Sequence, residues 1–269
     1  MPELVNDGVT ISYTDEGVGR PVVLLHGHTL DRRAWLPAVP HLLDAGLRVI
    51  RPDLRGHGRS DRPDFGYHFI HHAADMVAVL DAVGLERALV VGYLVGGGVA
   101  LELAITMPER VAGLVLVSPV MPDRPFDPEF MVNLKSVARA IRGDGVPAAM
   151  AGPWAESPLF EFSFTKPGIR EAVAAITKDF PGAEYLATQR DDVKRTWKVP
   201  DRLSGIDLPT TVVAGAEEMP GFIAFAEEAA AGIPGAALEL FENCGHLVPF
   251  EAPERLAAAI ITVAGMDSG

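Results

Sequence analysis

Apolar residues along the chain fall into two patterns that alternate with each other. Short runs that are apolar throughout, or that alternate with polar residues, predict strands at residues 9–13, 21–26, 47–51, 88–91, 111–117, 209–214 and 237–241. Apolar residues spaced three and four positions apart predict helices at residues 69–83, 95–107, 222–231 and 253–263. Strands that alternate with helices indicate an α/β fold with a doubly wound, mostly parallel sheet and right-handed crossovers.

This alternation stops between residues 121 and 200, where the pattern is helical, rich in aromatic residues, and without a predicted strand. We therefore interpret residues 1–120 and 201–269 as the α/β core and residues 121–200 as a helical cap. Open α/β sheets bind ligands at the carboxyl ends of their strands, so a cap placed there would cover a binding pocket.

Composition and charge narrow the possible partners. Hydrophobic residues make up 48% of the 269 residues, which is enough for a large core, and the formal net charge is -13. This charge argues against nucleic acids and anionic membrane surfaces as partners. No apolar run reaches the roughly 20 residues of a spanning helix, and the chain does not open like a signal peptide. We expect a cytoplasmic protein, monomeric or homodimeric, whose one cysteine cannot form an intramolecular disulfide.

The stretch LVVGYLVGGG, residues 89–98, has the frame of a nucleophile elbow, in which a strand turns sharply into a helix. Gly92 and Gly96 bracket the central position, where G-x-S-x-G has a serine and this chain has Leu94. A leucine side chain has no lone pair, so it cannot attack a carbonyl and no acyl-enzyme can form on it. Because both glycines are present, we expect the strained turn itself to be retained.

Four features, in chain order, resemble the α/β-hydrolase fold family. They are His26-Gly27-His28-Thr29 after a strand, the elbow at Leu94, Glu217-Glu218 after the strand at 209–214, and Asn243-Cys244-Gly245-His246. Residues 51–60 and 247–254 also resemble stretches of that family. The resemblance covers essentially the whole chain and implies the α/β-hydrolase fold with a helical lid.

The resemblance also implies roles for single residues. His246 matches the family's catalytic histidine, a suitable base because the ordinary pKa of histidine is about 6.5. Glu218 matches the acid that orients this histidine, while Glu217 and Asp123 remain alternatives for that role. No cofactor and no metal is expected.

Backbone N–H groups form the oxyanion hole in this family, and the resemblance assigns them to His28 and Val95. The His28 side chain could line the pocket or lie exposed at its rim.

Other candidate groups are given structural interpretations. We expect Tyr93 to point away from the cleft, and Cys244 and Ser118 to be structural. His68 and His72 have a spacing that could hold a metal, but we interpret them as part of a solvated helix start.

The leading functional hypothesis is a cofactor-independent, non-hydrolytic enzyme. In it, His246 oriented by Glu218 removes a proton from a small apolar carbonyl-containing molecule, as lyases, cyclases, isomerases or cofactor-free oxygenases of similar design would. One alternative is hydrolysis of a reactive ester or lactone by activated water. Two others are an engineered serine-to-leucine change at position 94 and a non-catalytic module that binds a small ligand.

Overall fold

The computed structural model describes residues 2–189, 191 and 193–266. Within them, eight strands form one sheet in the order β1-β2-β4-β3-β5-β6-β7-β8. The strands are β1 (Glu3–Asn6), β2 (Val9–Glu16), β3 (Arg20–Leu25), β4 (Leu47–Pro52), β5 (Ala88–Tyr93), β6 (Val111–Val117), β7 (Thr210–Gly215) and β8 (Ala237–Phe241). The pairs β1–β2 and β2–β4 are antiparallel, whereas every pair from β4 through β8 is parallel. The mostly parallel sheet is thus confirmed.

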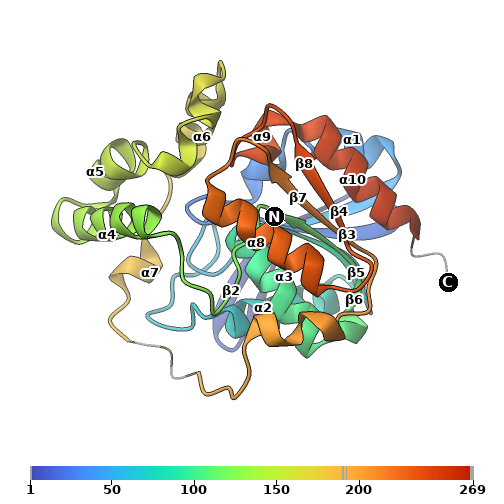
Figure 1. Ribbon diagram of the computed structural model, residues 1–269. Helices are drawn as coiled ribbons and strands as arrows, with labels where there is room; N and C mark the ends of the chain where they lie inside the picture. Colours follow the sequence, from blue (N-terminus) through green and yellow to red (C-terminus); the bar gives the residue numbers. More distant parts are fainter. Residues whose placement is uncertain (1, 190, 192, 267–269) are drawn as a thin grey trace.

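Helices cover both faces of this sheet (Figure 1). In the core they are α1 (Val39–Asp44), α2 (Phe69–Ala82), α3 (Val95–Thr106), α8 (Pro220–Gly232), α9 (Val248–Glu251) and α10 (Pro253–Met266). α2 packs against α3, and α1 packs against α10. With helices on both faces, β5 is buried along its whole length, which explains why its sequence is continuously apolar rather than alternating.

The sheet brings the loops of the site to one edge. β3, β5, β6 and β7 are parallel neighbours, so their carboxyl ends lie at the same edge of the sheet. The residues that follow these four strands therefore begin close together, although they are far apart in the sequence.

Between β6 and β7, the described residues form helices and no strand. The helices are α4 (Pro128–Gly143), α5 (Val146–Ala149), α6 (Ile169–Thr177) and α7 (Ala183–Leu186), with short helical turns between them. Figure 1 shows these four helices beside the core rather than on a face of the sheet. We refer to residues 121–200 as the helical segment.

Three short elements of the core were not predicted from the pattern, namely β1, α1 and α9. β1 has four residues, all at least partly exposed, and α1 buries only Val39 and Leu42 of its six residues. Elements this short contain too few apolar positions for a period to be recognised.

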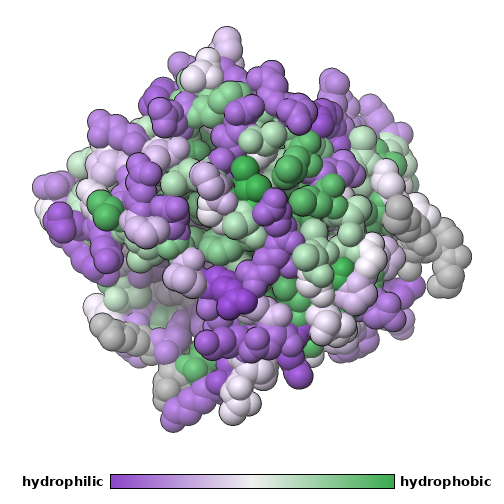
Figure 2. Space-filling model, in the orientation of Figure 1, coloured by the Kyte–Doolittle hydropathy of each residue, from purple (hydrophilic) through white to green (hydrophobic). Residues whose placement is uncertain are grey.

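The surface is mixed in character. On the face in Figure 2, hydrophilic residues prevail over the helical segment, and apolar residues gather toward the region of β8. β8 is the last strand of the sheet, and its Leu238 and Leu240 are exposed. None of the described helices is both long enough and apolar enough to span a membrane.

Candidate active site

Leu94 occupies a strained turn between β5 and α3. Its backbone angles are φ 52° and ψ -111°, a conformation that residues with a Cβ atom rarely adopt. The turn is tight on both sides. A Cβ atom at Gly92 would lie 2.2 Å from the carbonyl oxygen of Gly96, and one at Gly96 would lie 2.4 Å from that of Leu25. The structure therefore has the elbow geometry that the two glycines predict, with a leucine side chain at its centre.

His246 is buried and is oriented by a carboxylate. Its Nδ1 atom is hydrogen-bonded to Oε1 of Glu218, and Oε2 of Glu218 accepts a hydrogen bond of 2.6 Å from the Ser118 hydroxyl. The Nε2 atom of His246 is also buried and has no partner in the described residues. When Nδ1–H donates to the carboxylate, Nε2 carries the lone pair, and this is the arrangement of a base.

Of the three acids considered from the sequence, the structure brings only Glu218 to His246. Glu217 is exposed, and its backbone N–H donates to the carbonyl of Cys244. Asp123 is paired with Arg195 and accepts a hydrogen bond of 3.0 Å from the backbone of Val199. Asp123 thus joins two parts of the chain outside the site, so its placement as an alternative acid is wrong.

A second carboxylate holds the loop that carries His246. Glu251 accepts backbone hydrogen bonds from Gly245 at 2.9 Å and from Leu247 at 3.0 Å, one on each side of the histidine. Lys166 of the helical segment pairs with the same carboxylate at 3.0 Å. The loop is therefore fixed at both neighbours of His246, which restricts where its ring can point.

The proposed oxyanion donors lie in the wall of one cavity. His28 and Val95 both line it, and neither backbone N–H has an acceptor among the described residues. Val95 is the first residue of α3, so its N–H contributes to the partial positive charge at that helix terminus. The two amides are thus available for an anionic oxygen.

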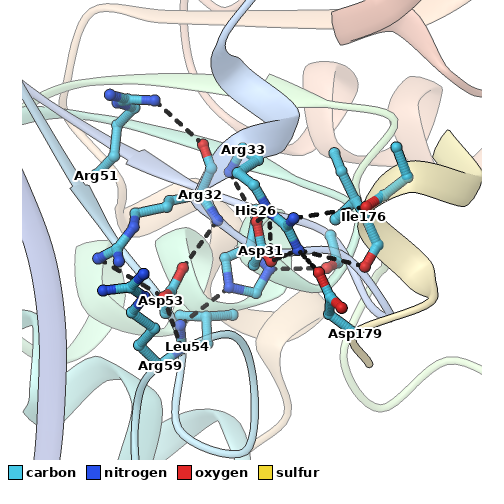
Figure 3. Close-up of polar contacts among 12 residues, drawn as sticks. His26, Asp31, Arg32, Arg33, Arg51, Asp53, Leu54, Arg59, Ile176 and Asp179 are labelled. Atoms are coloured by element: carbon cyan, nitrogen blue, oxygen red, sulfur yellow. Dashed lines mark hydrogen bonds and ion pairs between the residues drawn. The ribbon is translucent and has the colours of Figure 1, made fainter. Parts of the chain in front are cut away.

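The loop that carries His28 is held by buried polar groups (Figure 3). His26 Nε2 accepts a hydrogen bond of 2.9 Å from the backbone of Leu54. Asp53 accepts backbone hydrogen bonds of 2.9 Å from Arg32 and from Arg59. Burial lowers the pKa of His26 to about 4, so this imidazole is neutral near pH 7 and can accept as drawn.

The same loop is tied to the helical segment through Arg33. Figure 3 shows its guanidinium between Asp31 and Asp179. Its Nη2 atom donates to Asp31 at 2.7 Å and to Asp179 at 2.9 Å. It also donates to the carbonyl of Ile176 at 3.4 Å, close to the end of α6. One arginine therefore links the loop beside the oxyanion donors to the segment that closes the cavity.

The cavity has a volume of about 260 Å³ and a largely apolar wall. Leu94 and His246 line it from the core, and α4 and the residues after it line it from the helical segment. Its aromatic and aliphatic lining includes Phe69, Val120, Phe126, Phe130, Trp154 and Phe160. Such a wall suits a small apolar ligand that is oriented by a few polar groups.

Two residues interpreted as peripheral lie in the site itself. Tyr93 lines the cavity instead of pointing away from it, and its hydroxyl donates to the His246 carbonyl at 3.2 Å. Its ring fits because Gly27 lies opposite, where a Cβ atom would be 2.8 Å from the ring. Burial raises the pKa of Tyr93 well above 10, so the phenol stays protonated. Ser118, taken as structural, is a direct partner of Glu218.

Of the two histidines expected at a solvated helix start, His68 is partly exposed at the start of α2 and His72 is not. His68 caps the helix by accepting a hydrogen bond of 3.3 Å from the backbone of Ile70. His72 is buried, 2% exposed. Among the residues that the structure describes, no cluster of three potential metal ligands occurs.

Comparisons with known proteins agree with the fold. The family model described as alpha/beta hydrolase fold matches residues 20–253. A non-heme haloperoxidase from Rhodococcus erythropolis is 29% identical over 90% of this chain and 90% of its own. A 2-hydroxymuconate semialdehyde hydrolase from Pseudomonas putida is 29% identical over 96% of this chain and 92% of its own. Among solved structures, Est816, described as an N-acyl homoserine lactone degrading enzyme, is 33% identical. The match covers 96% of this chain and 98% of that chain, with a TM-score of 0.77.

Proposed function

The chain belongs to the α/β-hydrolase fold family, and from this premise we propose that it is a cofactor-independent enzyme that uses His246 as a general base. Its substrate would be a small, mainly apolar carbonyl compound, and no covalent intermediate would form at position 94. The observation that carries the proposal is the buried Nε2 atom of His246, which has no partner among the described residues while Nδ1 is held by Glu218. A buried lone pair without a partner is costly unless a ligand uses it.

The proposed reaction begins with the carbonyl oxygen near the backbone N–H groups of His28 and Val95. Nε2 of His246 removes a proton from the carbon next to the carbonyl, and the electron pair of that C–H bond moves into an enolate. The two amides stabilise the enolate oxygen, and the Glu218 carboxylate stabilises the imidazolium. If the imidazolium returns its proton to a different carbon, the result is isomerisation, and if it gives the proton to a leaving group whose bond to carbon breaks, the result is elimination. If the enolate carbon instead attacks a second carbonyl carbon of the same molecule, a C–C bond forms, the oxygen of that carbonyl takes the proton, and the result is cyclisation.

A test of this proposal need not use the natural substrate. In D2O, a base that removes α-protons exchanges the acetyl protons of 4′-methylacetophenone for deuterium, which NMR follows directly. General-base catalysis contributes about 10²–10⁴-fold, so we expect His246→Gln to slow this exchange at least about tenfold. Equal exchange rates in the protein and in His246→Gln would refute a basic role for His246.

A second candidate function is hydrolysis by activated water. The observation that favours it is the 33% identity to Est816, which is described as degrading a lactone. In this reaction His246 would deprotonate water instead of carbon, and the same amides would bind the tetrahedral oxyanion. Hydrolysis of a 4-nitrophenyl ester without a burst, lost in His246→Gln, would favour this candidate, whereas a stoichiometric covalent adduct would exclude it.

Leu94→Ser tests whether the machinery around the elbow is complete. A serine at this position would supply a hydroxyl to Nε2 of His246, for which the described part of the chain offers no partner, so we expect burst kinetics and labelling by a phosphonate ester. Leu94→Ala is the matched control, since it removes the same side chain without adding a hydroxyl. If Leu94→Ser shows neither burst nor labelling, the base or the oxyanion donors are not in working positions.

A further inference from the structure

The cavity contains a second group of polar side chains, distinct from His246 and Glu218. His28 Nε2 lies 2.8 Å from the hydroxyl of Tyr185 and 3.2 Å from Oε1 of Glu184. Glu184 and Tyr185 belong to α7 of the helical segment, and all three residues line the cavity. The segment therefore contributes a carboxylate and a phenol to a wall that is otherwise mainly apolar.

These three side chains have hydrogen-bonding capacity left over. An imidazole nitrogen carries either one proton or one lone pair, so His28 Nε2 can fully satisfy only one of the two oxygens that face it. No other donor in the described part of the chain reaches the Glu184 carboxylate, which can accept several hydrogen bonds. One oxygen of the cluster is thus available to a ligand in the cavity.

The charge of the wall restricts which ligand groups can use this capacity. Among the described residues that line the cavity, Glu184 is the only Asp or Glu, and no Lys or Arg is present. Burial lowers the pKa of His28 to about 4, so its side chain supplies no positive charge near pH 7. An anionic group placed here would lose its hydration without meeting a cation, and it would face the Glu184 carboxylate.

We propose that Glu184, together with His28 and Tyr185, forms a specificity site that binds a hydroxyl or ammonium group of the substrate and excludes carboxylates and phosphates. This rests on the proposed function for the carbonyl end of the substrate, which His246 would handle. The substrate class is then a neutral or cationic carbonyl compound that carries a hydrogen-bond donor on an otherwise apolar body.

The site can be tested by equilibrium binding, without turnover. The probes are four acetophenones that differ only at the 4′ position, which carries hydroxymethyl, aminomethyl, methyl or carboxylate, and their dissociation constants are measured by calorimetry. A hydrogen bond to a charged group corresponds to about tenfold or more in affinity. We expect the hydroxymethyl and aminomethyl probes to bind about tenfold more tightly than the methyl probe, and the carboxylate probe to bind most weakly.

Variants assign this preference to the cluster. Glu184→Gln should remove the preference for the aminomethyl probe over the methyl probe and should improve binding of the carboxylate probe. Tyr185→Phe should weaken binding of the hydroxymethyl probe and leave the other three affinities unchanged. Glu161→Gln is the matched control, because it makes the same change at an exposed position of the helical segment outside this cavity. If Glu184→Gln fails to fold, the proposal is still tested by Tyr185→Phe and by the order of the four affinities for the unmodified protein.

Three outcomes would overturn the proposal. The first is a carboxylate probe that binds the unmodified protein as tightly as the hydroxymethyl probe. The second is a change of all four affinities by the same factor in Glu184→Gln, which would mean that Glu184 only attaches the helical segment to the core. The third is no binding of any probe. Failure of the general-base proposal would give a different result. The order of the four probe affinities would stay as expected, but His246→Gln would exchange α-protons as fast as the unmodified protein.

Discussion

The strain at Leu94 can be measured by comparing Leu94→Gly with Leu94→Ala. Both substitutions remove the same buried side chain beyond Cβ, so they share the loss of apolar burial. They differ in how the new residue tolerates φ 52° and ψ -111°, because alanine keeps a Cβ atom and glycine does not. The difference in the free energy of unfolding between the two variants therefore measures the energetic cost of this backbone conformation.

The expected magnitude follows from two opposing contributions. A non-glycine residue in such a conformation costs about 1–3 kcal/mol, and glycine relieves that cost. Glycine also makes the unfolded chain more flexible than alanine does, which costs about 0.5–1 kcal/mol. We therefore expect Leu94→Gly to be more stable than Leu94→Ala by about 1 kcal/mol, and both to be less stable than the unmodified protein.

Urea unfolding followed by circular dichroism measures this difference, provided that the two variants have the same m value. A difference of 1 kcal/mol corresponds to about 2–4 °C in Tm for a chain of this size. Ala258→Gly is the control, at an exposed position in α10 with ordinary helical backbone. There glycine should be the less stable residue by about 1 kcal/mol, so the sign of the comparison is reversed.

Equal stability of the two Leu94 variants, or greater stability of the alanine variant, would refute the reasoning. It would mean that the positive φ at residue 94 carries no cost. Gly92 and Gly96 could then no longer be taken as a sign that the chain keeps a strained turn.

Two further predictions concern Ser118 and the buried histidines. Ser118→Ala leaves Oε2 of Glu218 without its donor. We therefore expect the free energy of unfolding, measured in urea, to fall by about 1–3 kcal/mol, and α-proton exchange to become slower. Unchanged exchange would show that Ser118 does not help to position Glu218 and His246. Burial lowers the pKa of His26 to about 4 and of His57 to about 3, against about 6.5 when unfolded. Between pH 6.5 and 4 the unfolded chain binds protons that the folded chain does not, so stability should fall by up to about 1.4 kcal/mol per pH unit for each histidine. Urea unfolding at pH 7.5 and pH 5 measures this loss, and greater stability at pH 5 would contradict it.

Much of the fold could be predicted from the sequence because long buried elements leave strong patterns. β5 and β6 are continuously apolar, and glycine and proline mark their ends and those of the neighbouring helices. His246, Glu218 and Leu94 follow from motifs next to such elements. His72 also had a signal that was missed, since Met76 lies four residues later and both face the buried side of α2.

Contacts between distant segments could not be predicted in the same way. Ser118 meets Glu218 only because β6 and β7 are neighbours whose register places the two strand ends together. Tyr93 enters the cavity wall because Gly27, on another strand end, leaves room for its ring. The sequence contains these residues but not the register, and the register decides which of them meet.

The retained elbow also has an evolutionary consequence. Some leucine and serine codons differ by one base, and the backbone at residue 94 already has the shape that a serine nucleophile would need. With one of those leucine codons, a single base change would place a hydroxyl on this turn, and the turn itself would not have to be rebuilt. For such a codon the change is equally short in both directions, so the residue at the centre of the turn can be exchanged while the shape of the turn stays the same.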